Sequence, residues 1–288
     1  MLGSSIVLAE SSHTIAGTYL WKVPKSKNFI KLDITDMDWI EKVLIDFNPD
    51  AIIHTAAMTN VDDCEKDPDY AKLLHVDGTK NILEISKEMG TYFVYISTDS
   101  VFDGMKGNYV EDDKPNPLNT YAKTKYHGEQ ITLGHKNTVV IRTNIYGYNW
   151  LDKQSIGEWI LFSLRDNKKI NLFHDVYFCP ILVNNLTEIL IEICEKRLTG
   201  VYHIAGVECV SKLEFGRRIA KIFELNEKLI KPISISELNL LAPRPLKPTL
   251  NCSKIQKETE TKLLSVNEGL KCFKKLENSG YLDRLKNL

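Results

Sequence analysis

Short apolar runs alternate with amphipathic stretches through the first two thirds of the chain, and this alternation limits the possible folds more than any other feature. The runs at residues 50–55, 92–97 and 139–142 hold too few polar side chains for strands with one face in water. Between them, residues 37–46 have the apolar spacing of a helix. Buried strands separated by helices predict a doubly wound α/β fold, whose ligands bind at the carboxyl ends of parallel strands.

The regular alternation of predicted strands and helices continues only as far as Gly147. We expect further strands at residues 14–19, 28–32 and 201–204, one helix ending near Gly90, and another beginning near Asn119. Beyond Gly147 we expect helices at residues 159–164, 186–194 and 213–223, and a proline-bearing loop at residues 239–253. This less regular part predicts a smaller α/β lobe over the carboxyl edge of the sheet.

The composition is that of an ordinary globular protein, with 43% hydrophobic and 26% charged residues. A net charge of −1 gives no electrostatic reason to expect nucleic acid or an anionic membrane as a partner. No apolar run reaches the roughly 18 residues that span a bilayer. The six cysteines are too widely spaced for a metal site or a disulfide scaffold. We therefore expect reduced, mostly buried thiols, no metal site and a cytoplasmic location.

The chain opens with a predicted helix, whereas a dinucleotide-binding fold opens with a strand and a glycine-rich turn. Gly3 falls where the last glycine of that turn would let the helix pack closely on the sheet. About five core side chains of such a strand contribute on the order of 10 kcal/mol, comparable to the stability of a whole domain, about 5–15 kcal/mol. We expect this strand to precede Met1 in the natural protein. The alternative is a genuine start at Met1 in a lineage that has lost cofactor binding.

Three side chains that suit carbonyl chemistry come together in the predicted fold. Thr98 ends a buried strand, and Tyr121 and Lys125 stand one helical turn apart after a proline-bearing loop. Tyrosine normally titrates near 10, and we expect the nearby ammonium to lower the pKa of Tyr121. The hydroxyl of Thr98 can hold a carbonyl oxygen beside the phenol. This order of elements favours a catalytic site over an exposed tyrosine beside a solvated lysine.

The same region resembles the dTDP-4-dehydrorhamnose reductase family of extended short-chain dehydrogenases/reductases. The matching positions are residues 97–104, 111–112, 115–119, 128–129, 142–143, 205–206, 244–245 and 250–254, together with Tyr121, Lys125 and His203. The resemblance implies a Rossmann-like sheet with a smaller α/β substrate lobe. It places a dinucleotide-binding domain at residues 1–146 and about 181–206, and the substrate-binding lobe at about 147–180 and 207–288.

The resemblance also implies an activity, namely reduction of the C4 ketone of a nucleotide-linked 4-keto-6-deoxyhexose. The expected substrate is dTDP-4-dehydro-L-rhamnose. NADPH or NADH would be the cofactor. Tyr121 would donate a proton to the ketone, Lys125 would bind the nicotinamide ribose and tune the phenol, and Thr98 would complete the triad. Cofactor contacts are expected at Gly3, Asp33, Ile34, Ala56, Ala57, Thr59, Tyr121 and Lys125. Substrate contacts are expected at Asp99, Asn144 and Arg244.

Several of these positions also have a plainer interpretation. Asp33 fits an ordinary loop before a helix capped by Asp36, and Arg244 fits a surface arginine. Two residues depart from the family pattern: Ser100 replaces a usual tyrosine, and His75 stands where an asparagine is common. We interpret His75 as a structural histidine with satisfied hydrogen bonds.

The sequence is also compatible with two other functions. The family includes a non-catalytic regulatory subunit of methionine adenosyltransferase, which is similar in the Thr98 and Tyr121 regions. A related reductase or epimerase acting on another sugar nucleotide is the third candidate. The resemblance also allows a homodimer, since some relatives dimerise with the help of a magnesium ion, but no carboxylate cluster in the sequence can be assigned to such an ion.

Overall fold

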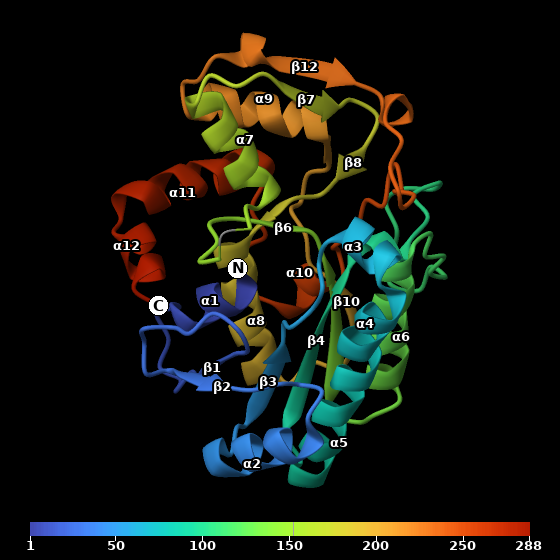
Figure 1. Cartoon of the computed structure of the whole chain (residues 1–288), viewed down its shortest axis with the longest axis vertical. Helices are drawn as coiled ribbons and strands as arrows, with labels where there is room; N and C mark the ends of the chain where they lie inside the picture. The colour runs from blue at the N-terminus through green and yellow to red at the C-terminus, as the bar shows by residue number, and fades with distance from the viewer. Residues whose placement is uncertain (152) are drawn as a thin grey trace.

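In the computed structural model, which describes residues 1–151 and 153–288, a four-stranded parallel sheet forms the centre of the larger part of the molecule (Figure 1). Its order is β10-β5-β4-β3, and the strands are β3 (Ala51–His54), β4 (Tyr92–Thr98), β5 (Thr138–Thr143) and β10 (Gly200–His203). Each neighbouring pair runs parallel, so the carboxyl ends of the strands meet at one edge. The predicted α/β fold with a parallel sheet is confirmed.

Helices cover both faces of this sheet, and the side chains of β4 explain why. Tyr92 and Val94 belong to the hydrophobic cluster that includes α1 and α8, whereas Phe93 and Tyr95 belong to the cluster that includes α2 and α5. Successive side chains of a strand point to opposite faces, so a strand covered on both faces needs apolar residues throughout. The covering helices are α1 (Leu2–Val7) and α8 (Val183–Lys196) on one face, and α2 (Met37–Phe47), α5 (Gly78–Met89) and α6 (Thr120–Leu133) on the other (Figure 1).

The segment between β3 and β4 was expected to hold one helix ending near Gly90. The structure divides it into α3 (Val61–Lys66), α4 (Pro68–Lys72), a π-helical turn (Leu73–Asp77) and α5. Gly90 ends α5 in the left-handed conformation, with a φ of 70°, as a glycine does readily. The π-helical turn carries His75, which it places against the start of α6.

Two more parallel strands, β1 (Gly17–Tyr19) and β2 (Phe29–Lys31), form a sheet of their own. They lie beyond β3 and are not hydrogen-bonded to it (Figure 1). The parallel sheet is therefore interrupted between β3 and β1 in the part of the chain that the structure describes.

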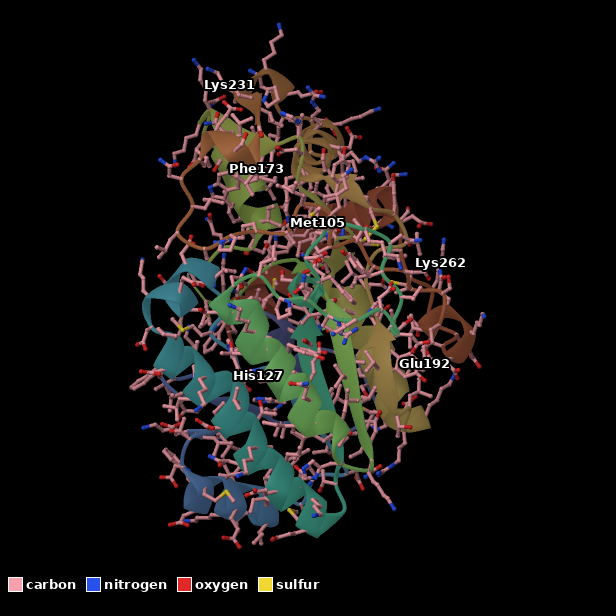
Figure 2. The ribbon with its side chains drawn as sticks, turned by 90° about the vertical axis from the view of Figure 1, so that its right-hand side faces the viewer. Met105, His127, Phe173, Glu192, Lys231 and Lys262 are labelled. Carbon is pink, nitrogen blue, oxygen red and sulfur yellow. A yellow bond between two sulfur atoms is a disulfide. The ribbon has the colours of Figure 1, made fainter. Side chains whose placement is uncertain are left out.

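The second lobe lies over the carboxyl edge of the sheet and has its own hydrophobic cluster. Phe173 and Lys231 lie in this lobe, far from His127 on the outer face of α6 (Figure 2). Its strands are β7 (Ile170–Phe173), β8 (Tyr177–Phe178), β11 (Val210–Ser211) and β12 (Ile230–Ile233). The short parallel pair of β6 (Ile145–Tyr146) and β9 (Ile181–Leu182) contributes side chains to both hydrophobic clusters, where the lobe meets the sheet. Its helices are α7 (Ile156–Arg165), α9 (Lys212–Ile222), α11 (Val266–Asn278) and α12 (Tyr281–Lys286), whereas α10 (Ile255–Glu258) packs through Ile255 on the cluster that covers the sheet. Four short helical turns, at Asp99–Val101, Glu227–Leu229, Ile235–Glu237 and the π-helical turn above, complete the described chain.

The cysteines depart from the expectation of reduced thiols, because Cys179 and Cys209 form a disulfide. The antiparallel pairing of β8 with β11 sets Phe178 opposite Val210, and the same register brings the next residues, Cys179 and Cys209, face to face. Their separation in the sequence gave no hint of this pairing. The other cysteines, at positions 64, 194, 252 and 272, are free thiols.

None of the helices within residues 1–151 and 153–288 has both the length and the apolar character that crossing a lipid bilayer requires.

The contact of α6 with β4 generates a first prediction. Gly128 lies where a Cβ atom would be 2.7 Å from the carbonyl oxygen of His75 and would also clash with the Tyr95 phenol. Gly128→Ala should therefore destabilise the protein by about 1–3 kcal/mol, despite the higher helix propensity of alanine. Urea denaturation measures the change. Gln130→Ala, on the exposed side of the same helix, is the control and should stay within about 0.5 kcal/mol of the parent. Equal stability of Gly128→Ala and the parent would contradict the close packing.

Candidate active site

A groove of about 1300 Å³ runs along the interruption in the sheet and up to its carboxyl edge. Its upper end is lined by Thr98, Tyr121 and Lys125, the three residues expected to form a triad. Ligands of open parallel sheets bind at this edge. The structure therefore brings the three side chains to one cavity in the expected place.

Backbone and side-chain contacts at the start of α6 fix the direction of Tyr121. Asn119 caps the helix, and its side chain accepts a hydrogen bond from the backbone N–H of Ala122 at 2.9 Å. The N–H of Thr120 donates to the Glu65 carboxylate at 2.9 Å. The Tyr121 ring meets the His75 ring edge to face, with centroids 5.8 Å apart. The phenol is thereby held towards the end of β4.

The charge state of Tyr121 differs from the expectation. Burial raises the pKa of Tyr121 to about 12, and a hydrogen bond with the Thr98 side chain only partly offsets this effect. The sequence predicted a lower pKa because of the Lys125 ammonium, but desolvation of the phenolate dominates, and the group that acts against it is the Thr98 hydroxyl. Tyr121 is therefore protonated at neutral pH and can donate its proton.

Lys125 lies one helical turn further and is only 2% exposed. Burial lowers the pKa of Lys125 to about 7, although the nearby carboxylate of Glu129 acts in the opposite direction. The ammonium nitrogen lies 4.1 Å from the centroid of the Tyr95 ring, a distance suited to a cation–π contact. Lys125 can therefore gain or lose its charge close to neutral pH.

His75 links the loop after β3 to α6 through hydrogen bonds of both ring nitrogens. Its Nε2 accepts a hydrogen bond from the backbone N–H of Met58 at 3.0 Å, and its Nδ1 lies 2.8 Å from the hydroxyl oxygen of Thr124. Burial lowers the pKa of His75 to about 3, so the ring is neutral. These contacts join the loop after β3 to α6, as the structural interpretation of this histidine implies.

A buried polar cluster lies beside the triad at the start of the second lobe. The Asn144 side chain donates to the Asp99 carboxylate at 2.6 Å, and both residues line the groove. Burial raises the pKa of Asp99, and Asn144 and Lys212 act against this rise. Sequence analysis missed Lys212, the first residue of α9, whose ammonium lies 3.3 Å from the centroid of the Phe178 ring. Burial lowers the pKa of Lys212 to about 8.

Comparison with known proteins adds a second line of evidence. The family model described as the RmlD substrate binding domain matches residues 4–277. The chain belongs to this family. The family inferred from the sequence motifs is therefore confirmed.

Both a regulatory subunit and reductases are among the proteins similar to this chain. It is 33% identical over 241 residues to methionine adenosyltransferase 2 subunit beta of Xenopus tropicalis, a match that covers 80% of this chain and 71% of that protein. A hypothetical dTDP-4-dehydrorhamnose reductase from Sulfolobus tokodaii has a similar crystal structure, with a TM-score of 0.81, 32% identity, and coverage of 92% of this chain and 93% of that one. The dTDP-4-dehydrorhamnose reductase of Bacillus anthracis, solved in complex with NADP, gives a TM-score of 0.81 and 28% identity, with coverage of 86% and 89%.

The structure places most of the cofactor contacts expected for this RmlD-family chain in the groove. Gly3, Ile34, Ala56, Ala57 and Thr59 all line it. A Cβ atom at position 3 would lie 3.2 Å from the Thr55 hydroxyl oxygen, so α1 passes close to the end of β3, as the fingerprint glycine predicts. The cofactor roles of these residues stay predictions.

Asp33 and Arg244 are not among the residues that line the groove. The Asp33 carboxylate accepts hydrogen bonds from the backbone N–H and the hydroxyl of Thr35, at 2.9 and 2.7 Å, and so shapes the turn before α2. Arg244 pairs with the Asp62 carboxylate at 2.9 Å and donates to the Ala242 carbonyl. In this RmlD-family chain both side chains therefore already have partners away from the groove.

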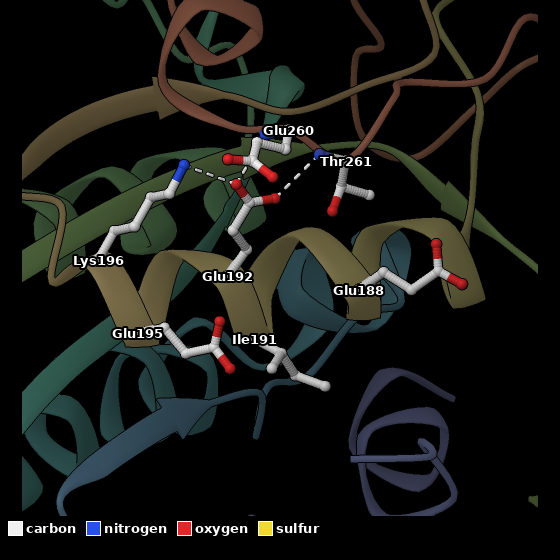
Figure 3. Close-up of a pocket in the computed structure, with 7 residues that line it drawn as sticks. All are labelled: Glu188, Ile191, Glu192, Glu195, Lys196, Glu260 and Thr261. Atoms are coloured by element: carbon white, nitrogen blue, oxygen red, sulfur yellow. Dashed lines mark hydrogen bonds and ion pairs between the residues drawn. The ribbon is translucent and has the colours of Figure 1, made fainter. Parts of the chain in front are cut away.

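A second hollow lies between α8 and the loop after α10 (Figure 3). The Glu192 carboxylate accepts hydrogen bonds there from the backbone N–H groups of Glu260 and Thr261, at 2.7 and 3.0 Å, and pairs with Lys196. These contacts tie the loop to the helix and occupy both oxygens of Glu192. Within residues 1–151 and 153–288, no three His, Cys, Asp or Glu side chains are grouped as metal ligands.

The charge of Lys125 generates a prediction that requires no assumption about function. The unfolded lysine keeps its proton up to about 10.5, whereas the folded one loses it near 7. Between these values the unfolded chain binds more protons, so the contribution of Lys125 to stability rises with pH. Lys125→Met should therefore be more stable than the parent at pH 7. Its advantage should shrink by about 1 kcal/mol per pH unit towards pH 10.

Denaturant titrations of both proteins at pH 7 and pH 10 measure this difference. Exposed Lys123→Met on the same helix is the control and should show no such pH-dependent change. A stability difference for Lys125→Met that is the same at both pH values would contradict a depressed pKa for Lys125.

Proposed function

We propose that this chain is a sugar-nucleotide reductase that converts the C4 ketone of a nucleotide-linked 4-keto-6-deoxyhexose to an alcohol. The proposed substrate is dTDP-4-dehydro-L-rhamnose, and the proposed cofactor is NADPH or NADH. The observation that carries the proposal is the meeting of Thr98, Tyr121 and Lys125 in one groove at the carboxyl end of β4.

Each of the three groups has a task in ketone reduction. Thr98 and Tyr121 present two hydroxyl groups, and together these can hold and polarise a carbonyl oxygen. Tyr121 holds its proton at neutral pH and can pass it to the oxygen as the negative charge develops. The Lys125 ammonium faces the same groove and stabilises that charge.

A reduced nicotinamide, when bound, supplies the hydride that the keto carbon receives. The residues at the upper groove suit such a cofactor. Gly3, Ala56 and Ala57 line the groove with a small side chain or none, so that a ligand can approach the backbone, and Lys125 can donate hydrogen bonds to ribose hydroxyls. The NADP complex of the similar Bacillus anthracis reductase supports this assignment.

The proposed substrate pocket lies between the triad and α9. Asp99 and Asn144 offer a carboxylate and an amide to sugar hydroxyls, and Lys212 adds positive charge next to them. Arg244 would join the nucleotide only if its pair with Asp62 opened. Ser100, in place of the usual tyrosine, would enlarge the sugar pocket.

Tyr121→Phe tests the reductase proposal, because this change removes only the acidic hydroxyl. Turnover of dTDP-4-dehydro-L-rhamnose, measured from the loss of NADPH or NADH absorbance and by mass analysis of the product, should fall at least about a hundredfold. Tyr126→Phe, five residues further along the same helix, is the matched control and should keep parental turnover. Near-parental turnover in Tyr121→Phe would remove Tyr121 from the mechanism.

A second function is supported by the 33% identity to methionine adenosyltransferase 2 subunit beta. As a non-catalytic regulatory subunit, the chain would bind a methionine adenosyltransferase and change its kinetics. The retained Tyr121 and Lys125 do not exclude this function, since the regulatory subunit is similar in the same regions, so only an experiment separates the two.

Co-purification with a methionine adenosyltransferase separates the two functions. The reductase proposal predicts no stable complex and no change in the KM of that enzyme for methionine. A stable complex together with no turnover of the keto sugar by the parent chain would instead establish the regulatory function.

A further inference from the structure

We propose that Glu129 is a positioning residue that keeps the Lys125 ammonium charged and in place at the candidate site. Arg142 supports this role, because its guanidinium keeps the Glu129 carboxylate ionised. Neither Glu129 nor Arg142 lines the groove, although both match the family pattern. The consequence for catalysis rests on the proposed function, in which a charged Lys125 stabilises the oxygen of the ketone as it is reduced.

The Lys125 ammonium is buried without a hydrogen-bonding partner of its own. Lys125 is 2% exposed, and its ammonium nitrogen lies 4.1 Å from the centroid of the Tyr95 ring. Within residues 1–151 and 153–288, no oxygen forms a hydrogen bond or an ion pair with this nitrogen. A buried ammonium loses its proton easily unless a nearby anion favours the charged form. The charge of Lys125 therefore depends on the carboxylates around it.

Glu129 supplies the negative charge among the groups that face Lys125. Four other titratable side chains pack around this lysine: Tyr95 of β4, Tyr121 of α6, His54 of β3 and His75 of the π-helical turn. Burial raises the pKa of each phenol and lowers the pKa of each imidazole, so all four are neutral at pH 7. Glu129 lies one helical turn after Lys125, and its carboxylate raises the pKa of this lysine.

Arg142 of β5 keeps the Glu129 carboxylate ionised in the protein interior. Its Nε and Nη2 each donate a hydrogen bond to a different oxygen of Glu129, at 3.0 and 2.8 Å. The hydroxyl of Ser97 donates a further hydrogen bond to the same carboxylate. Hydrogen bonds of this kind, above all from a cation, favour the charged form of a carboxylate. The pair thus fixes a negative charge one turn from Lys125.

His203 and Phe102 hold the Arg142 guanidinium in this position. Its Nη1 donates to Nε2 of His203 at 3.3 Å, and its central carbon lies 5.1 Å from the centroid of the Phe102 ring. Burial lowers the pKa of His203 to about 3, so the ring is neutral and Nε2 can accept. Its Nδ1 donates to the carbonyl oxygen of Tyr109 at 3.0 Å. These contacts keep the guanidinium against Glu129.

The hydrogen bond between Ser97 and Glu129 also connects two parts of the triad. Ser97 directly precedes Thr98 on β4, and Glu129 follows Lys125 by one turn of α6. The bond therefore fixes the end of β4 relative to the helical turn that carries Lys125. Glu129 thus influences both the charge and the place of Lys125 without reaching the groove.

The pH dependence of the proposed reductase follows from this arrangement. The pKa of Lys125 is lowered to about 7. Reduction that needs the ammonium should decline as the pH rises through this value. Without the Glu129 carboxylate the decline should move to lower pH, because no anion then favours the charged lysine.

An NMR titration of the Lys125 side chain tests the inference without any cofactor or substrate. The lysines are labelled with stable isotopes, and the Lys125 signal is assigned by its loss in Lys125→Met. The double variant Glu129→Gln/Arg142→Met removes the pair and leaves no unpaired buried charge at these two positions. It should lower the pKa of Lys125 by at least about one pH unit. Glu129→Gln alone keeps the Arg142 cation and should lower this pKa at least as far.

Ser97→Ala is the matched control, because it removes a contact of Glu129 and leaves every charge in place. The pKa of Lys125 should keep its parental value in this variant. An unchanged pKa of Lys125 in the double variant, or an equal fall in Ser97→Ala, would overturn the inference and leave the pair with a structural role alone.

Turnover of the keto sugar distinguishes this inference from the reductase proposal. In the double variant, the pH at which kcat falls to half should move down by as much as the NMR titration. A shifted NMR titration in a chain without turnover would retain the role of Glu129 and reject the proposed function. Turnover with an unshifted NMR titration and an unshifted pH profile would do the reverse.

Discussion

The packing of α6 against β4 is the constraint on which the candidate site depends. Gly128 lets the helix approach the Tyr95 ring and the π-helical turn, since any larger residue would clash there. The buried ion pair of Arg142 with Glu129, 2.8 Å apart, ties the same helix to β5. Removing one partner of such a pair would leave an uncompensated buried charge. This packing holds the phenol and the ammonium of α6 beside the last residue of β4.

Burial at this helix–strand contact also decides the charges of the site. Desolvation disfavours a phenolate on Tyr121 and an ammonium on Lys125, and it moves their two pKa values to about 12 and about 7. A proton donor that stays protonated next to a cation of adjustable charge suits reduction of a ketone.

Much of the fold followed from the sequence because it depends on local patterns. The apolar run at residues 92–97 became β4, and the amphipathic stretch at residues 37–46 became α2, each within one residue at either end. The meeting of Thr98, Tyr121 and Lys125 in one groove followed as well, because helical spacing and strand order together place them. Their catalytic roles stay predictions. Such features need only short-range information.

The features that escaped prediction depend on contacts between distant parts of the chain. The Cys179–Cys209 disulfide follows from the register of β8 and β11, and the pair of Arg244 with Asp62 follows from the docking of a late loop on α3. The pKa of Tyr121 went against the expectation because the extent of its burial is a property of the whole fold. Lys212 reaches Asp99 only through the way the second lobe lies over the sheet.

The central claim is that the groove aligns a ketone with the Tyr121 proton and a nicotinamide hydride. The most direct measurement uses dTDP-4-dehydro-L-rhamnose and NADPH or NADH carrying deuterium at the transferred position of the nicotinamide ring. The account predicts one deuterium at C4 of the sugar product, detected by NMR and mass spectrometry. A product without deuterium at C4, or an unchanged keto sugar with either cofactor, would contradict it.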